Sequence, residues 1–150
     1  MERIGSIIQR GEEIITPVTP LEEVISLLHN RKYPFLIVET MKKPWIITID
    51  NVLFSLLPAI FDLLEEYDYF QHFGLLEQEF MQNIRGGLFL AEDVMEEIRD
   101  SLSVEDTPIK AAIVLNRKKR PALPVLDKEG RYCGYINKTM IAYMLVQGAE

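Results

Sequence analysis

Residues 107–136 read TPIKAAIVLNRKKRPALPVLDKEGRYCGYI, and this stretch decides the fold because an earlier part of the chain repeats its pattern. Thr19-Pro20-Leu21 returns as Thr107-Pro108-Ile109, at an offset of 88 residues (108 − 20). Self-similarity at a fixed spacing indicates related structural units. We therefore expect two copies of one unit, over residues 16–57 and 104–145.

The second copy predicts a helix, two strands and a helix, in that order. The Thr107-Pro108 pair suits an N-cap followed by the first helical position, so a helix begins here. It ends in the basic run 117–120, which suits the negative end of the helix dipole. Apolar runs predict strands over residues 122–126 and 132–136, and a last helix follows residues 137–139.

The first copy predicts the same order of elements. The Thr19-Pro20 pair belongs to a Thr-x-x-Glu capping box, which predicts a helix with an apolar stripe behind it. Residues 35–38 read as a buried strand and residues 45–47 as its hairpin partner. Residues 48–51 then open a second helix.

A segment that neither copy explains separates the two units. Residues 58–90 have the apolar spacing of helices, which would pack on the units or on a partner chain. Beyond the hairpins the offset becomes 89, which aligns Ile47 with Ile136. The expected organisation is a first repeat over residues 1–57, the helical insertion over 58–90 and a second repeat over 91–150. Aromatic residues that would form core or a dimer interface in the insertion are Tyr67, Tyr69, Phe70 and Phe73.

Composition narrows the class of protein. The chain has 150 residues, 23 acidic and 16 basic, and its net charge of −7 argues against a general nucleic-acid binder. The single cysteine, Cys133, allows no intramolecular disulfide and fits a reducing compartment. The most apolar stretch, residues 52–64, is too short to span a bilayer, and the first residues lack the pattern of a signal peptide. We expect a cytoplasmic protein that binds neither nucleic acid nor membrane.

The order and spacing of these motifs resemble the cystathionine-β-synthase (CBS) domain family. The second repeat carries the resemblance best, through Asp93-Val94-Met95, residues 104–108, residues 123–127 and residues 130–134, while the first keeps residues 46–51. The chain is thus similar to a stand-alone tandem CBS pair, or Bateman module. The resemblance implies an α+β fold of two βαββα-type lobes, related by a pseudo-twofold axis with clefts between them, plus the helical insertion.

The resemblance also implies a function. Modules of this family typically sense adenosine compounds such as AMP, ADP, ATP or S-adenosylmethionine, commonly form homodimers, and regulate a partner protein without catalysing a reaction. We therefore expect no enzyme and no cofactor, but a regulatory adenosine ligand and a protein target that the sequence does not identify. The alternative is a ligand-free dimeric scaffold with the same fold.

The start of the second helix is where the family holds ribose and phosphate, and here it carries Thr48, Asp50 and Asn51. A helix N-terminus offers free N–H groups to phosphate oxygens. Aspartate or asparagine can engage the two ribose hydroxyls. The same residue types are also the preferred helix caps, so a purely structural role stays open.

The strand before the hairpin is where the family holds adenine. The matching residues of the first repeat are Tyr33 and Phe35, and Thr16, in the short extended segment before the first helix, completes the candidate site. Ordinary core packing is the alternative role for the two aromatic side chains. At an offset of 88, Leu36 stands where the second repeat has Pro124.

The second cleft is the weaker candidate. Asn137 and Met140 replace Thr48 and Asn51, and a methionine cannot accept hydrogen bonds from a ribose diol in the way an amide can. Candidate residues for this second site are Arg120, Leu123, Asn137 and Thr139.

Other chemistry has little support in the sequence. Two histidines and one cysteine are too few and too scattered for a zinc site, so we expect no metal. The Gly86-Gly87 pair lacks the spacing of a phosphate loop, and no residues suggest a nucleophile, base and oxyanion arrangement.

Overall fold

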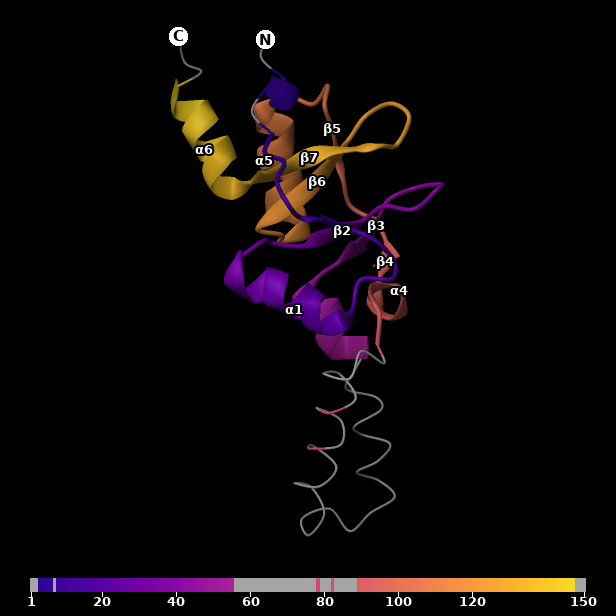
Figure 1. Cartoon of the computed structure of the whole chain (residues 1–150). Coiled ribbons are helices and arrows are strands. Elements are labelled where there is room, and N and C mark those ends of the chain that lie inside the picture. Colours follow the sequence, from indigo (N-terminus) through magenta and orange to yellow (C-terminus); the bar gives the residue numbers. More distant parts are fainter. Residues whose placement is uncertain (1–2, 7, 56–77, 79–81, 83–88, 148–150) are drawn as a thin grey trace. The chain divides into compact units, whose positions relative to one another are not determined.

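The computed structural model describes residues 3–6, 8–55, 78, 82 and 89–147 (Figure 1). The predicted helices of the insertion, with their aromatic residues, fall almost wholly outside these described residues. The chain forms two compact units. The β1–β4 unit comprises residues 14–40 and 45–96, and the β5–β7 unit comprises residues 1–13, 41–44 and 97–150.

The β1–β4 unit is built on a four-stranded sheet. Its strands are β1 (Ile14–Ile15), β2 (Leu36–Val38), β3 (Trp45–Ile47) and β4 (Glu96–Glu97), in the order β1-β2-β3-β4. β1 pairs with β2 in parallel, and β2 pairs with β3 as an antiparallel hairpin. Strand β3 has the bounds that the sequence predicts, and β2 begins one residue later than expected because Phe35 lies outside the ladder.

Helices cover this sheet and close its core. They are α1 (Leu21–Asn30), the helical residues 49–55 and the short α4 (Ala91–Val94). Burial of apolar side chains is the main force that holds such a layer on a sheet. The buried residues of this core are Ile15, Leu21, Val24, Leu36, Val38, Ile47, Val52, Ala91 and Val94.

The β5–β7 unit repeats the arrangement. Its sheet has the order β5-β6-β7, from β5 (Leu102–Ser103), β6 (Ala122–Leu126) and β7 (Tyr132–Asn137). The helices α5 (Pro108–Lys118) and α6 (Lys138–Gln147) pack beside each other over this sheet (Figure 1). The predicted α+β class with two related sheets is confirmed. The buried residues of this core are Ile4, Leu102, Ala111, Leu115, Leu123, Val125, Ile136 and Ile141.

The N-terminal segment of the chain belongs to the unit of the second repeat. In η1 (Ile4–Ser6), Ile4 N donates to Asp106 O at 2.9 Å and Gly5 N donates to Val104 O at 3.2 Å. Further on, Gln9 pairs with Tyr135 as an antiparallel bridge beside β7. We call residues 3–6 and 8–13 the lead-in of the first repeat, and Gln9 within it extends the second sheet.

The lead-in of the second repeat, residues 91–96, makes the reciprocal contacts in the β1–β4 unit. Ala91 N donates to Thr19 O at 2.8 Å and Glu92 N donates to Pro17 O at 3.0 Å, and β4 then completes the four-stranded sheet. Each of these partners lies 87 residues (91 − 4) from its counterpart in the other unit. The two repeats thus exchange their lead-ins.

The same spacing corrects the alignment of the repeats. Before the hairpin, buried positions correspond at an offset of 87, as in Val24 with Ala111 (111 − 24) and Leu36 with Leu123 (123 − 36). After the hairpin the offset is 89, as expected. The match of Leu36 with Pro124 is therefore wrong. The offset of 88 aligns the two Thr-Pro pairs, but these pairs occupy different cap positions in the two helices.

The helix starts show why the Thr-Pro pairs mislead. Thr107 is the N-cap of α5 and its hydroxyl accepts from Lys110 N at 3.4 Å, as predicted. In α1 the N-cap is Pro20, without a side-chain cap, while Thr19 Oγ1 accepts from Thr16 N at 3.2 Å instead. The predicted capping box of the first helix is therefore wrong.

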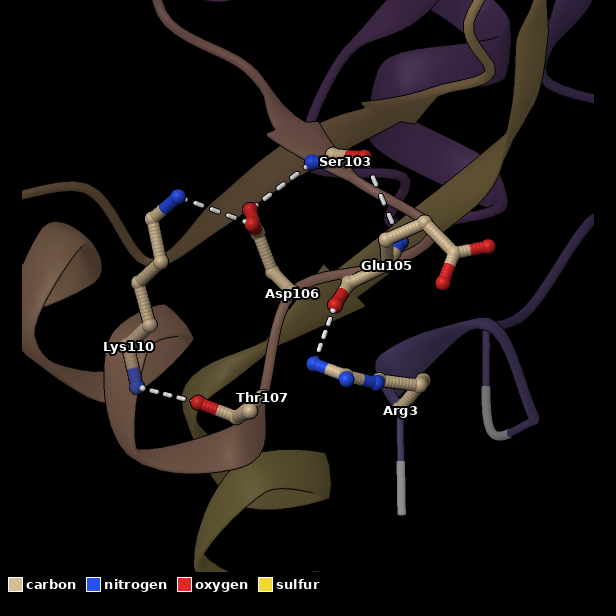
Figure 2. A network of polar contacts seen from close by, with 6 residues as sticks. All are labelled: Arg3, Ser103, Glu105, Asp106, Thr107 and Lys110. Atoms are coloured by element: carbon tan, nitrogen blue, oxygen red, sulfur yellow. Dashed lines mark hydrogen bonds and ion pairs between the residues drawn. The ribbon is translucent and has the colours of Figure 1, made fainter. Parts of the chain in front are cut away.

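A polar network fixes the start of α5 (Figure 2). Asp106 is 9% exposed, and its carboxylate accepts from Ser103 N and from Lys110 Nζ, each at 2.9 Å. Arg3 Nη1 donates to Glu105 O at 2.9 Å from the exchanged lead-in. These contacts give the buried Asp106 carboxylate two donors and position the start of the helix.

Candidate functional site

The start of helix 49–55 is built around Thr48. Its Oγ1 accepts from Asn51 N at 3.1 Å, and its carbonyl accepts from Val52 N at 3.0 Å. Thr48 therefore caps the helix. By helix geometry, the N–H groups of residues 49 and 50 have no acceptor within the helix, which leaves them available to an anion.

Asn51 is half-buried in the first turn of this helix. Its Nδ2 donates to the carbonyl oxygen of Val94, the last residue of α4. This bond holds the exchanged lead-in of the second repeat, a contact for which the sequence carries no signal. Within the described part of the chain, no hydrogen bond is made to Asn51 Oδ1, which can still accept one.

Asp50 lies between these two residues and is exposed. Its carboxylate makes no hydrogen bond or ion pair with another described residue, so it is free to meet a ligand. A carboxylate accepts hydrogen bonds through both oxygens and suits a pair of neighbouring hydroxyls.

The remaining candidates of the first site come from two segments of the β1–β4 unit. Thr16 is exposed just after β1, and its hydroxyl lies 3.2 Å from that of Thr19. Tyr33 is half-buried and packs against the core, while Phe35 is only 3% exposed. In this structure Phe35 has the burial of a core residue, and Tyr33 and Thr16 are more accessible to a ligand.

The second site has the same capping geometry with different chemistry. Asn137 Oδ1 accepts from Met140 N at 2.7 Å, as Thr48 does from Asn51 N in the other repeat. Met140 packs against the core. Thr139 is exposed and lies at the position equivalent to Asp50, at the offset of 89 (139 − 50).

The other two residues of the second site differ in accessibility. Arg120 is exposed, and its N–H donates to Leu115 O at 3.1 Å, which closes the end of α5. Leu123 is 3% exposed and belongs to the core of the β5–β7 unit. The assignment of these residues to a ligand stays a prediction.

Buried polar residues outside the candidate sites also escaped the sequence analysis. Glu13 is fully buried and accepts from Tyr132 Oη at 2.8 Å and from Gly11 N at 2.6 Å. Burial and the bond to Glu13 raise the pKa of the Tyr132 hydroxyl well above its usual value. Burial likewise raises the pKa of the Cys133 thiol, which keeps it protonated.

Two further observations concern metal and membrane. Among the described residues, no group of three or more His, Cys, Asp or Glu side chains is placed to hold a metal ion. In the same part of the chain, no helix has the length and apolar character needed to cross a bilayer.

Comparisons with known proteins identify the architecture. A family model for the CBS domain matches residues 91–146. A crystal structure of CBSX2 in complex with AMP is 15% identical, with a TM-score of 0.68 over 100% of both chains. CBSX2 from Arabidopsis thaliana, described as a CBS-pair protein, is 18% identical with a TM-score of 0.66 over 97% of this chain and 95% of that one.

A longer protein shares the same architecture. A protein from Methanocaldococcus jannaschii, described as a putative archaeal homologue of γ-AMPK, is 20% identical with a TM-score of 0.71. The match covers 96% of this chain but 48% of that one. No curated protein matches the sequence. At these identities the likeness shows the fold.

Proposed function

We propose that this chain, whose residues 91–146 are a CBS domain and whose fold is that of a tandem CBS pair, is a non-catalytic regulatory module. It binds an adenosine-containing ligand, AMP, ADP, ATP or S-adenosylmethionine, and regulates a partner protein. The complex of CBSX2 with AMP supports this choice of ligand class for the fold.

One observation carries the proposal: the exposed Asp50 carboxylate stands on a helix start whose first N–H groups have no acceptor within the helix. The carboxylate and Asn51 Oδ1 would accept from the ribose hydroxyls. The N–H groups and the positive end of the helix dipole would hold a phosphate. Tyr33 and Thr16 would lie on the adenine side of the site.

Asp50 gives the sharper test, because Asn51 also has a structural bond to Val94. We expect AMP, ADP, ATP or S-adenosylmethionine to raise the melting temperature of the wild-type chain, since a ligand selective for the folded state stabilises it. Asp50→Ala should weaken binding by about tenfold, the equivalent of ~1.4 kcal/mol, because a charge-assisted hydrogen bond is lost. Isothermal titration calorimetry measures the change.

Glu22→Ala is the matched control, because Glu22 is an exposed carboxylate in the first turn of α1, in the same unit as Asp50 and outside both candidate sites. It should leave the affinity unchanged. If no adenosine compound shifts the melting temperature at millimolar concentration, the proposed ligand class is wrong.

The alternative function, a ligand-free scaffold, has one observation in its favour. Thr48 and Asn51 both have internal partners, namely the helix N–H groups and Val94 O. Under this alternative, Asn51→Ala lowers stability and there is no nucleotide affinity to change. Truncation of Phe70 or Phe73, the other test of a scaffold, concerns residues outside the described part of the chain.

A further inference from the structure

The end of helix α5 and the start of α6 carry a cluster of exposed positive charge. Its members, which we call the cationic cluster, are Arg117, Lys119, Arg120 and Lys138. None of these four side chains makes a hydrogen bond or ion pair with another described residue. Lys118 does not belong to the cluster, because its ammonium is ion-paired with Asp100 at 3.2 Å.

Backbone contacts bring the cluster to one end of the β5–β7 unit. Arg120 N donates to Leu115 O at 3.1 Å, so the chain turns at the end of α5 and leads directly into β6. Strand β6 begins where its antiparallel partner β7 ends. Lys138 N then donates to Pro121 O at 3.1 Å, which places the start of α6 next to the residue that follows Arg120.

The backbone also fixes the position of Lys119. This residue is the C-cap of α5 and has a left-handed conformation, with φ +52°, in which glycine is the usual residue. Lys32, at the equivalent position of the first repeat (119 − 32 = 87), has φ +54°. The left-handed lysine is therefore common to both repeats, and the repeats differ in the residues around it.

The first repeat carries little charge at the positions equivalent to the cluster. Offsets of 87 before the hairpin and 89 after it relate the four residues of the cluster, in order, to Asn30, Lys32, Tyr33 and Ile49. Thr139, which follows the last of them, corresponds to Asp50 (139 − 50 = 89). The tyrosine and aspartate proposed for adenine and ribose are thus replaced by Arg120 and Thr139. One repeat has a lysine balanced by a carboxylate, and the other has four cations and no acid.

We propose that the cationic cluster binds a free inorganic polyphosphate, such as tripolyphosphate or pyrophosphate, and not a nucleoside. Unpaired cations at one end of the unit repel each other, and an anion with several charges relieves this repulsion. Guanidinium and ammonium groups also make strong, charge-assisted hydrogen bonds to phosphate oxygens. A nucleoside finds less here, because neither Thr139 nor Met140 supplies the carboxylate or amide that suits a ribose diol.

The size of the anion follows from the charge of the rest of the chain. The net charge of −7 disfavours a long polyanion such as a nucleic acid, whose phosphates extend beyond the cluster. A short phosphate chain meets only the cations. The inference goes beyond the proposed function, because this binding requires no adenosine compound.

Isothermal titration calorimetry of the full, nucleotide-free chain with sodium tripolyphosphate is the first test. We expect a dissociation constant below about 1 mM at about 0.1 M salt. Arg117→Gln and Arg120→Gln should each raise it about fivefold, because each removes a charge-assisted contact. Lys128→Gln is the matched control, since Lys128 is an exposed lysine at the opposite end of the β6–β7 hairpin, and it should leave the affinity unchanged.

Lys119→Gly separates binding from folding. It removes the ammonium but supplies the residue that the left-handed backbone favours. The variant should therefore bind tripolyphosphate about fivefold more weakly, while its melting temperature without ligand stays at or above that of wild type. A loss of affinity in this variant cannot come from unfolding.

The source of the phosphate chain is tested in the Asp50→Ala variant, whose proposed adenosine site is weakened. ATP and tripolyphosphate should compete there and bind within about threefold of each other, because the nucleoside adds no contact. A short single-stranded oligonucleotide should bind more weakly than tripolyphosphate. Adenosine should not compete.

Three results would overturn the proposal. The first is a dissociation constant for tripolyphosphate above about 1 mM, or equal weakening by Lys128→Gln and Arg120→Gln, which would leave only non-specific attraction. The second is ATP binding in Asp50→Ala more than about tenfold tighter than tripolyphosphate and weakened by Arg120→Gln, which would assign the cluster to a nucleotide. The third is tighter binding of the oligonucleotide. Absence of an adenosine effect on the melting temperature bears only on the proposed function.

Discussion

The Tyr132 hydroxyl donates to the buried Glu13 carboxylate, and burial with this bond raises its pKa. A raised pKa in the folded state contributes stability that is present below the ordinary tyrosine pKa of about 10 and is lost as the pH rises above it. Tyr132→Phe should lower the free energy of unfolding by about 1–3 kcal/mol at pH 8, because Glu13 loses a donor while remaining buried. The difference between wild type and variant should shrink by roughly 1 kcal/mol between pH 9 and pH 11.

Urea unfolding at the two pH values measures this difference. Tyr143→Phe is the control, because its exposed hydroxyl makes no hydrogen bond with another described residue. A gap between wild type and Tyr132→Phe that stays constant with pH would show that the hydroxyl ionises as freely in the folded chain as in the unfolded one.

The capping roles at the candidate site could be predicted residue by residue, but the tertiary contacts could not. Residue type alone identifies Thr48 and Asn137 as helix-start residues, and both accept from the N–H three residues later. The bond from Asn51 to Val94 joins residues 43 positions apart, and no local pattern specifies such a pair. The side chain suited to a ribose diol is thus also a structural anchor.

At the scale of elements, Gly134 in β7 is a position where a neighbouring backbone segment approaches closely. Its φ is +151°, and a Cβ here would lie 2.7 Å from Gln9 O, the carbonyl that accepts from Tyr135 N. Gly134→Ala should lower the free energy of unfolding by about 2 kcal/mol or more, since both the backbone conformation and the contact of the added Cβ with Gln9 O are unfavourable. Gly130→Ala has φ +80° but open space around the added Cβ, so it should cost only about 1 kcal/mol.

Thermal unfolding of the two variants side by side gives the comparison. If both variants lost the same stability, the segment around Gln9 would have to move away from β7 with little loss of free energy. That result is incompatible with its role as a strand-like partner of the sheet.

Local sequence signals predict the central elements well and the exchanged ones poorly. The bounds of β3 and β6 match the predicted runs 45–47 and 122–126, because apolar runs flanked by turn residues are strong local signals. The two-residue β4 and the Gln9 bridge carry no such pattern, since their partners are distant in sequence. The alignment of the repeats at an offset of 88 is wrong for a related reason. Two identical dipeptides occupy different cap positions, and only burial shows which residues correspond.

At the scale of the whole molecule, the exchange of lead-ins makes the compact units differ from the two continuous sequence repeats. The sequence suggests consecutive boundaries at residues 57/58 and 90/91, which remain a proposal. The compact units instead combine residues 1–13 with 97–150, and residues 91–96 with the first repeat. Neither repeat as a continuous stretch of sequence contains its whole core.

Ile4 tests this exchange, because it is fully buried in the core of the β5–β7 unit although it comes from the other end of the chain. Ile4→Ala should destabilise that unit by about 2–5 kcal/mol, through lost apolar burial and the cavity that remains. Hydrogen exchange followed by mass spectrometry should show faster exchange across α5, β6 and β7. Val18→Ala, at a residue 66% exposed, should change neither stability nor exchange.

Faster exchange confined to residues 3–9 would mean that the lead-in only rests on a self-sufficient second repeat. Faster exchange throughout the unit would mean that the first residues of the chain are needed to complete the fold of residues 97–150.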